Sequence, residues 1–152
     1  MKVRELMIQD VVSVHEYTTV KDVLALFVKH RIGGVPVVDD FNHLIGMLSD
    51  GDVLRYLSPK DESIRDLWMM AFVIEGETIE DVLKRKIERR VYQMMKRKPV
   101  VYVSAEDDFE DAIRLLSKHH FKKLPVVDDH HCVIGVVSRG DIMVQLSKKI
   151  IS

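Results

Sequence analysis

The chain has 152 residues, of which 47% are hydrophobic and 31% are charged, which is typical of one globular domain or of two small ones that share a core. Its formal net charge of -1 gives no bulk attraction to nucleic acid or to an anionic membrane, and no apolar run approaches the roughly 20 residues that a membrane helix needs. The N-terminus does not resemble a secretory signal and the single cysteine excludes an internal disulfide, so we expect a cytoplasmic protein.

An internal repeat dominates the sequence. Residues 35–40 return almost unchanged as residues 124–129, and residues 46–53 return as residues 135–142. Both pairs have an offset of 89, and the longer stretches around them share 18 identities in 47 positions at this offset. Such a repeat indicates one structural unit that is present twice.

In each copy the hydrophobic period changes in an order that predicts β-α-β-β-α. In the first copy we expect a strand at 11–14, a helix at 20–28 that is capped by Thr18 or Thr19 and ended by Gly33 and Gly34, a hairpin of 35–38 and 45–48 around the polar turn 39–43, and a helix at 50–57. In the second copy we expect a strand at 100–103, a helix from 109 that ends near Phe121, and a hairpin and a final helix at the repeated positions.

The sequence also predicts structure outside the two copies. A helix is expected before each copy, at 3–7 and at 79–95, and the cations of the second one indicate a solvated face. The spacer 58–78 has no counterpart, and its apolar part at 67–74 predicts burial at the repeat junction or in a dimer contact, with a lid over a ligand as the alternative. The expected domains are therefore 1–57 and 79–152, separated by a partly buried spacer.

The turn after each hairpin combines a serine with an aspartate three residues later. These pairs are Ser49 with Asp52 and Ser138 with Asp141. Ser-x-x-Asp is a capping box, in which both side chains bind free N–H groups where a helix begins. The same geometry suits a nucleoside phosphate, because the helix N-terminus and the hydroxyl favour a phosphate while the carboxylate accepts from ribose hydroxyls. A cap and a binding site both remain open on these residues alone.

Two β-α-β-β-α copies that carry "h-P-V-V-D-x…h-h-G-h-h-S-x-x-D", where h is hydrophobic, resemble a tandem pair of CBS domains, the Bateman module. The resemblance covers nearly the whole chain apart from the spacer. It implies an α+β fold in which the repeats pack through their sheets into a pseudo-twofold module. It also implies two clefts between the repeats that bind adenine nucleotides or related ligands, with Asp52 and Asp141 on the ribose and Ser49 and Ser138 on the phosphate side.

The two expected clefts differ in charge. Basic residues before the "h-P-V-V" strand often hold phosphates in this family, and Lys122, Lys123 and Arg139 of the second copy replace two glycines and Asp50 of the first. Because Arg139 attracts a phosphate that Asp50 repels, we expect the second cleft to bind an anionic nucleotide more tightly. The residues expected at this cleft are Pro99, Val100, Val101, Lys122, Lys123, Leu124, Pro125, Ser138, Arg139 and Asp141. Those expected at the weaker cleft are Val11, Val12, Gly34, Val35, Pro36, Ser49 and Asp52.

The sequence predicts neither a metal site nor a catalytic site. His119-His120 and the cluster 130–132 suggest a metal site, but the repeat aligns them with a helix end and a polar hairpin turn, so we expect no metal. No acid/base pair, activated thiol or phosphate-binding loop of an enzyme is recognisable, so we expect no catalysis.

We therefore expect a regulatory sensor whose ligand is an adenine nucleotide such as AMP, ADP or ATP, without any other cofactor. The alternatives are a sensor of S-adenosylmethionine and a protein–protein interaction module with degenerate clefts. The family resemblance also implies a homodimer, while a regulated partner protein is left open. The expected dimer surface is formed by Val53, Leu54, Leu57, Ile142, Met143 and Leu146.

Overall fold

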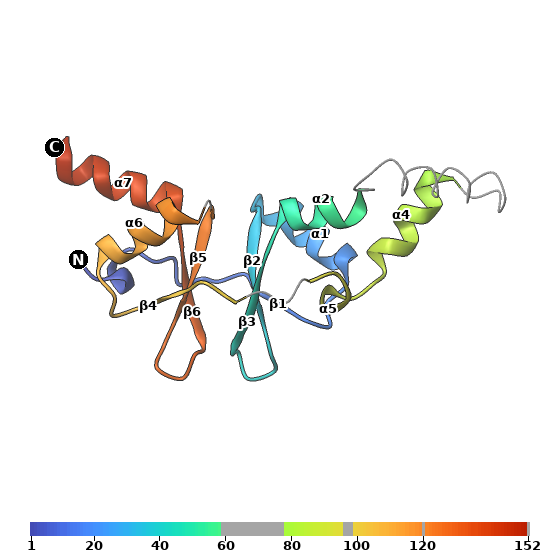
Figure 1. The fold of residues 1–152 in the computed structure, drawn as a ribbon, viewed down its shortest axis with the longest axis horizontal. Helices are drawn as coiled ribbons and strands as arrows, with labels where there is room; N and C mark the ends of the chain where they lie inside the picture. The colour runs from blue at the N-terminus through green and yellow to red at the C-terminus, as the bar shows by residue number, and fades with distance from the viewer. Residues whose placement is uncertain (59–77, 96–98, 120, 152) are drawn as a thin grey trace. The chain divides into compact units, whose positions relative to one another are not determined.

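The structure is a computed structural model, and it describes residues 1–58, 78–95, 99–119 and 121–151. The apolar part of the spacer at 67–74, for which the sequence predicts burial, lies outside the described residues. The first repeat contains η1 (Val3–Glu5), β1 (Val14–His15), α1 (Val20–His30), β2 (Gly34–Val38), β3 (Leu44–Ser49) and α2 (Asp50–Leu57) (Figure 1). The rest of the chain contains α4 (Ile79–Ile87), α5 (Val91–Met94), β4 (Val103–Ser104), α6 (Phe109–Lys118), β5 (Lys123–Val127), β6 (Val133–Ser138) and α7 (Arg139–Ile150). The predicted α+β class with two β-α-β-β-α repeats is confirmed.

The strands form two sheets of three, in the orders β1-β2-β3 and β4-β5-β6. In the second sheet β4 runs parallel to β5, with Val103 beside Val126. β5 and β6 form an antiparallel hairpin in which Lys123 lies opposite Ser138. This register places the start of β5 beside the end of β6, where the helix α7 begins.

The first strand of each repeat is shorter than the sequence predicts. Val11 and Val12 precede β1, and Val100 and Val101 precede β4, so none of the four belongs to a strand. All four are half-buried, and Val11 and Val100 pack on one apolar cluster made of Val38, Leu44, Val127 and Val133. The β-branched side chains of Val11 and Val100 therefore serve packing rather than strand pairing, which the sequence pattern does not distinguish.

Two predicted helix ends are also wrong. α1 ends at His30, and Arg31, not a glycine, takes the left-handed cap conformation with φ 52°. Gly33 has another role, because a Cβ at this position would approach Asp50 Oδ2 to 2.8 Å. α6 ends at Lys118 rather than near Phe121.

The single helix predicted over 79–95 is two helices, α4 and α5. Between them the backbone is used for tertiary hydrogen bonds: the carbonyl of Arg89 accepts from Val20 N at 2.9 Å, and Val91 N donates to the carbonyl of Thr18 at 2.8 Å. A continuous helix would require these groups for its own ladder. The helix predicted at 3–7 is likewise only the 3-10 turn η1.

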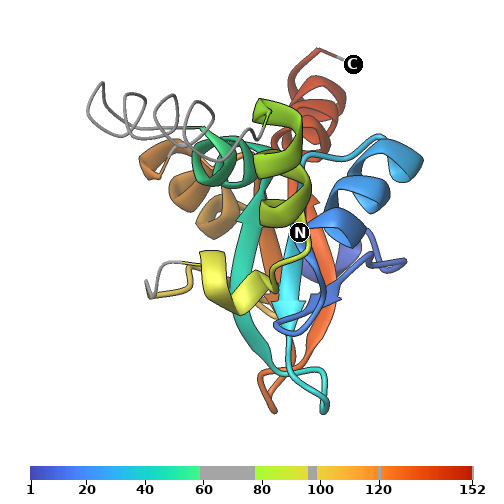
Figure 2. The same ribbon diagram turned by 90° about the vertical axis from the view of Figure 1, so that its right-hand side faces the viewer.

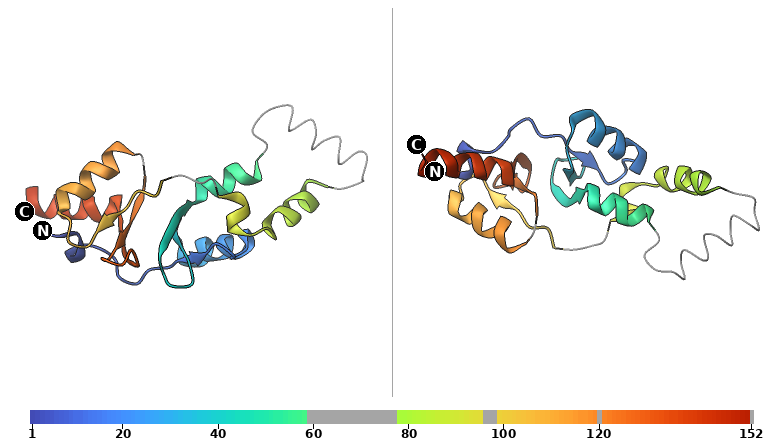
Figure 3. Two further views of the ribbon diagram at one scale, coloured as in Figure 1. Left: turned by 60° about the horizontal axis from the view of Figure 1, so that its bottom comes forward. Right: turned by 90° about the horizontal axis from the view of Figure 1, so that it is seen from above.

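The contacts within the chain group its residues into two compact units. The first unit contains Met1–Val14, Gly34–Met47 and Lys98–Ser152, and the second contains His15–Gly33 and Leu48–Arg97. The segments that precede the repeats are thus exchanged: the blue N-terminal segment lies beside the orange and red elements of the second repeat, and α5 lies beside the start of α1 (Figure 3). The boundaries predicted for the domains remain predictions from the repeat.

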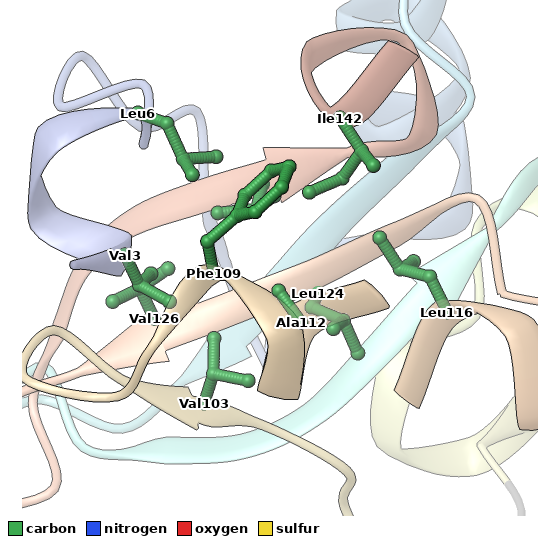
Figure 4. Close-up of a cluster of buried hydrophobic side chains, with 10 residues drawn as sticks. Val3, Leu6, Val103, Phe109, Ala112, Leu116, Leu124, Val126 and Ile142 are labelled. Carbon is green, nitrogen blue, oxygen red and sulfur yellow. The ribbon is translucent and has the colours of Figure 1, made fainter. Parts of the chain in front are cut away.

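The first unit has a core to which the N-terminal segment contributes. Val3 is fully buried, and it lies with Phe109 and Ala112 of α6 over the strand residues Val103 and Val126 (Figure 4). The cluster is completed by Leu6, Leu116, Leu124, Val137 and Ile142. Since Val3 and Leu6 belong to this core, the second repeat needs residues from the N-terminal segment to complete the burial of its apolar surface.

The turns of the two hairpins lie next to each other within the first unit (Figure 2). Leu44 N donates to the carbonyl of His131 at 3.1 Å, and Val133 N donates to the carbonyl of Asn42 at 3.1 Å. Asn42 and His131 both have positive φ, near 65°, which a tight polar turn requires. The predicted polar turn at 39–43 is therefore confirmed, and its counterpart has the same conformation.

Candidate functional site

Ser138 and Asp141 form a complete capping box at the start of α7, called here the Ser138 box. Ser138 N donates to Asp141 Oδ2 at 2.9 Å, Ser138 Oγ donates to the same oxygen at 2.8 Å, and Asp141 N donates to Ser138 Oγ at 3.1 Å. No described residue donates a hydrogen bond to the other carboxylate oxygen, Asp141 Oδ1. The cap therefore uses one oxygen of the carboxylate and leaves the second one for another donor.

Two lysines stand beside the Ser138 box because of the strand register. Lys123 is half-buried and lies directly opposite Ser138 in the hairpin, while Lys122 is exposed just before the strand. The next residues along β5, Leu124 and Pro125, are buried and form the apolar support of this strand. The structure thus places Lys123 beside Ser138, the residue that caps α7 together with Asp141.

Arg139 is held by backbone carbonyls. Its Nε donates to the carbonyl of Phe121 at 2.6 Å, its Nη2 donates to that of Leu116 at 3.4 Å, and its N–H donates to that of Lys122 at 2.9 Å. The guanidinium therefore connects the end of α6 to the start of α7. The sequence did not predict this structural role, and it fixes the position of a positive charge next to Lys122.

The residues expected to contact an adenine, Pro99, Val100 and Val101, lead into β4. Because β4 is parallel to β5, the chain before Val103 approaches the same end of the sheet as Lys123. Val101 packs on the core of the first unit and Val100 on the cluster with Val38, whereas Pro99 is exposed. All ten residues predicted for the tighter site lie in the first unit.

Ser49 and Asp52 repeat the same hydrogen bonds at the start of α2, called here the Ser49 box. Ser49 N and Ser49 Oγ each donate to Asp52 Oδ2 at 2.9 Å, and Asp52 N donates to Ser49 Oγ at 3.2 Å. Both residues belong to the second unit, whereas the other residues predicted for the weaker site belong to the first: Val11, Val12, Gly34, Val35 and Pro36. Val35 and Pro36 are buried within β2.

The Ser49 box has a partner that the predicted site does not contain. Arg55 Nη2 donates to Asp52 Oδ1 at 2.7 Å, so both oxygens of this carboxylate are bonded. Partial burial raises the pKa of Asp52, but the hydrogen bonds from Ser49 and Arg55 outweigh it and hold the pKa below its ordinary value of 3.8. The Asp-x-x-Arg spacing on a helix was the signal in the sequence that could have identified this pair.

The histidines and the cysteine of the hairpin turns take part in local contacts. Asp39 Oδ1 accepts from the N–H groups of Phe41 and His43, and Asp128 Oδ1 accepts from those of His130 and Cys132, each at 2.9 Å. Within the described ranges, no group of three His, Cys, Asp or Glu side chains is placed to hold a metal ion. In the same part of the chain, no helix combines the length and apolarity needed to cross a bilayer.

Comparison with known proteins identifies both repeats. A family model described as the CBS domain matches residues 3–59 and 91–148. The uncharacterized protein MJ1426 of Methanocaldococcus jannaschii is 33% identical, over 94% of this chain and 89% of its own length. The chloroplastic protein CBSX2 of Arabidopsis thaliana, which contains CBS domains, is 32% identical over 83% of this chain. This match covers 54% of CBSX2, so the chain spans about half the length of the plant relative.

Solved structures agree with these matches. The crystal structure of CBSX2 in complex with AMP has a TM-score of 0.72 and 29% identity, and the match covers 99% of this chain and 98% of that one. A second crystal structure of CBSX2 has a TM-score of 0.76 and 27% identity, with coverage of 99% and 97%. Protein MJ1225 of Methanocaldococcus jannaschii has a TM-score of 0.80 at 19% identity over 99% of this chain and 51% of that one, a likeness of fold alone.

Proposed function

Because the chain belongs to the family of CBS-domain proteins, we propose that it is a cytoplasmic regulatory module that senses an adenine nucleotide at the Ser138 box. One observation carries the choice of this box: the strand register sets Lys123 opposite Ser138, one turn from the open carboxylate oxygen of Asp141. The complex of CBSX2 with AMP supports the class of ligand.

In the proposed site, different residues bind the ribose, the phosphate and the adenine of the ligand. Asp141 Oδ1 accepts from a ribose hydroxyl, and the Ser138 hydroxyl and the N-terminus of α7 lie on the phosphate side. Lys122 and Lys123 neutralise the phosphate, and Arg139 adds its charge from the place where Phe121 holds it. Residues 99–101 contact the adenine, with Leu124 and Pro125 behind them.

In this proposal the ligand is a signal and not a substrate. A ligand that binds two arrangements of the module with different affinity shifts their populations, and a partner protein responds to that shift. We expect binding without turnover, since a proposed site of hydroxyl, carboxylate and lysines contains no activated nucleophile. The copies differ in charge, so we also expect one tight and one weaker binding event.

A panel titration tests the proposal. AMP, ADP, ATP, adenosine and S-adenosylmethionine are titrated into the whole chain, with melting temperature and calorimetry as the measurements. We expect AMP to stabilise the wild type, and we expect Asp141→Ala to weaken AMP binding at least tenfold, because one charged hydrogen-bond acceptor is lost. Unchanged binding in Asp141→Ala would contradict the assigned site.

Asp81→Ala is the matched control. Asp81 forms a capping box with Thr78 at the start of α4, with hydrogen bonds of 3.1 and 3.2 Å, so its loss has a similar effect on a helix cap. We expect this variant to lower the melting temperature and to bind AMP like the wild type. A preference for S-adenosylmethionine over AMP would favour the alternative sensor, and binding of no member of the panel would favour the interaction module.

We also propose a homodimer, but the surface predicted for it needs correction. Val53 and Ile142 are 1% and 6% exposed and face the cores, whereas Leu54 and Met143 are 66% and 63% exposed. Exposed apolar side chains on α2 and α7 are typical of a contact surface. We expect Met143→Glu to convert a dimer to a monomer in sedimentation velocity, and Val28→Glu, at an even more exposed site on α1, to leave the dimer intact.

A further inference from the structure

The two capping boxes have the same internal hydrogen bonds, but only the Ser49 box has an arginine on its aspartate. At the offset of 89 that relates the repeats, the position of Arg55 in α2 corresponds to Val144 in α7. Arg55 donates to Asp52 Oδ1 at 2.7 Å, whereas Val144, 53% exposed, has no group that could donate to Asp141. The difference therefore falls on the one carboxylate oxygen that each cap leaves free.

Arg55 also covers the backbone at the start of its helix. A Cβ on Gly51 would lie 3.1 Å from Arg55 Nη1 and 3.6 Å from its Cζ, so the guanidinium lies over Gly51. At the corresponding Gly140 the nearest atom of the described residues to a Cβ is Ser138 Oγ, at 3.6 Å. The guanidinium of Arg55 thus covers the start of the helix in the Ser49 box, and no side chain among the described residues takes that place in the Ser138 box.

We propose that Arg55 is a specificity-determining residue that closes the Ser49 box to a nucleotide and makes the two repeats unequal. This inference rests on the proposed function, since it explains which box takes the ligand. A ribose hydroxyl that donates to Asp52 competes with the guanidinium for the carboxylate oxygen that the cap leaves free, and this competition weakens nucleotide binding by up to the strength of the ion pair. Asp50, which stands where Arg139 stands in the other repeat, adds repulsion toward the phosphate.

The expected size of the effect follows from the exposure of the pair. The side chains of Asp52 and Arg55 are 35% and 63% exposed, and pairs of this kind contribute up to about 1 kcal/mol, which corresponds to about a fivefold change in affinity. An arginine at a helix N-terminus that is free of other partners has the opposite effect, because it attracts phosphate. The geometry favours closure, since the guanidinium is already bonded to the carboxylate that the ribose needs.

Exchange of the two residues tests the proposal. Calorimetry with AMP is performed on the wild type, Arg55→Val and Val144→Arg, and each variant receives a residue that the other repeat already tolerates. We expect Arg55→Val to tighten the weaker binding event about fivefold or to make it visible as a second equivalent. We expect Val144→Arg to weaken the tighter event about fivefold. In the Asp141→Ala background, Arg55→Val should restore an AMP-dependent rise in melting temperature.

Arg114→Val is the matched control, because Arg114 Nη1 donates to Asp111 Oδ1 at 3.0 Å with the same spacing on α6, and Asp111 belongs to neither box. We expect it to bind AMP like the wild type. Weaker AMP binding by Arg55→Val would mean that the arginine contacts the ligand, and unchanged binding in both exchange variants would also overturn the closure. If either of these outcomes is found while the wild type still binds AMP through Asp141, the role of Arg55 is refuted and the proposed function stands. If the wild type and both variants bind no AMP, the proposed function fails with it.

Discussion

Lys2 and Asp108 are joined by a hydrogen-bonded ion pair of 2.9 Å and by a backbone bridge, although 106 positions separate them in the sequence. The corresponding bridge in the other unit joins Arg90 to Thr19. Each segment that precedes one repeat is therefore bonded to the first helix of the other repeat.

Val3→Ala is expected to destabilise the second repeat rather than the first. Val3 is fully buried against Phe109 and Val126, so the loss of two methyl groups and the cavity left behind cost about 1–3 kcal/mol. Hydrogen exchange followed by mass spectrometry checks this, with faster exchange expected in β5 and β6. Val28→Ala, at an exposed site, serves as the control. If Val3→Ala accelerated hydrogen exchange in α1 and not in β5 and β6, the packing of the N-terminal segment on the second repeat would be contradicted.

Val91→Ala is the mirror experiment. Val91 is also fully buried, and its N–H bonds to the carbonyl of Thr18, so the same substitution should loosen the first repeat. We expect faster hydrogen exchange in α1 and α4, by a similar loss of about 1–3 kcal/mol. Equal loosening of both units by Val3→Ala and by Val91→Ala would show that the units do not open separately.

The attachment of the N-terminal segment should depend on pH. The hydrogen bond and the charge of Lys2 hold the pKa of Asp108 below 3.8, and those of Asp108 raise the pKa of Lys2 above 10.5. The carboxylate thus contributes stability that is present above pH 3.8 and is lost as the pH falls through its lowered pKa. The ammonium contributes stability that is present below pH 10.5 and is lost as the pH rises through its raised pKa.

Carbon-detected NMR of the Asp108 carboxyl group checks the acid limb. We expect Lys2→Met to move the pKa of Asp108 up toward 3.8. Lys21→Met, which removes an exposed ion pair of 3.7 Å with Glu88, should leave the pKa of Asp108 where it is in the wild type. An unshifted titration of Asp108 in Lys2→Met would refute the assigned cause.

Gly135→Ala should destabilise the first unit. A Cβ on Gly135 would lie 2.6 Å from Met7 Sδ and 3.1 Å from the carbonyl oxygen of Ile8, so the N-terminal segment would have to move, at a cost of about 1–3 kcal/mol. Urea denaturation measures the change. Met7→Ala in the same chain should recover part of the loss, and simple additivity of the two changes would contradict the contact. Gly140→Ala is the matched control, because its Cβ meets nothing closer than 3.6 Å.

The sequence predicts correctly those helices, strands and turns whose conformation depends on residues near them in the chain. The hairpins β2–β3 and β5–β6, the helix α2 and both capping boxes follow from local patterns of residues. The ends of α1 and of the long predicted helix do not, because Arg31 replaces a glycine as the cap and the backbone around Arg89 is used by another segment. Local propensity does not contain such tertiary competition.

The sequence contains a weak indication that the segments preceding the two repeats are equivalent. Val3 and Met7 correspond to Val91 and Met95 at an offset of 88, one residue less than the offset of the repeats. An alignment fixed at 89 therefore pairs unlike residues in these segments. Only the hydrogen bonds, such as Val3 N to the carbonyl of Asp107 and Val91 N to that of Thr18, show that they are equivalent. Arg55 was missed for another reason, since the repeat directs attention to what the copies share.

The exchange also sets the order in which the protein can fold on the ribosome. Synthesis proceeds from the N-terminus, so η1 emerges first but finds its place only after α6 and β5 have been made. The second unit, in contrast, is complete once residue 97 has left the exit tunnel. We infer that the second unit, which carries the Ser49 box, folds before the part of the chain that carries the Ser138 box has been synthesised. Until then the N-terminal segment lacks the elements on which it packs.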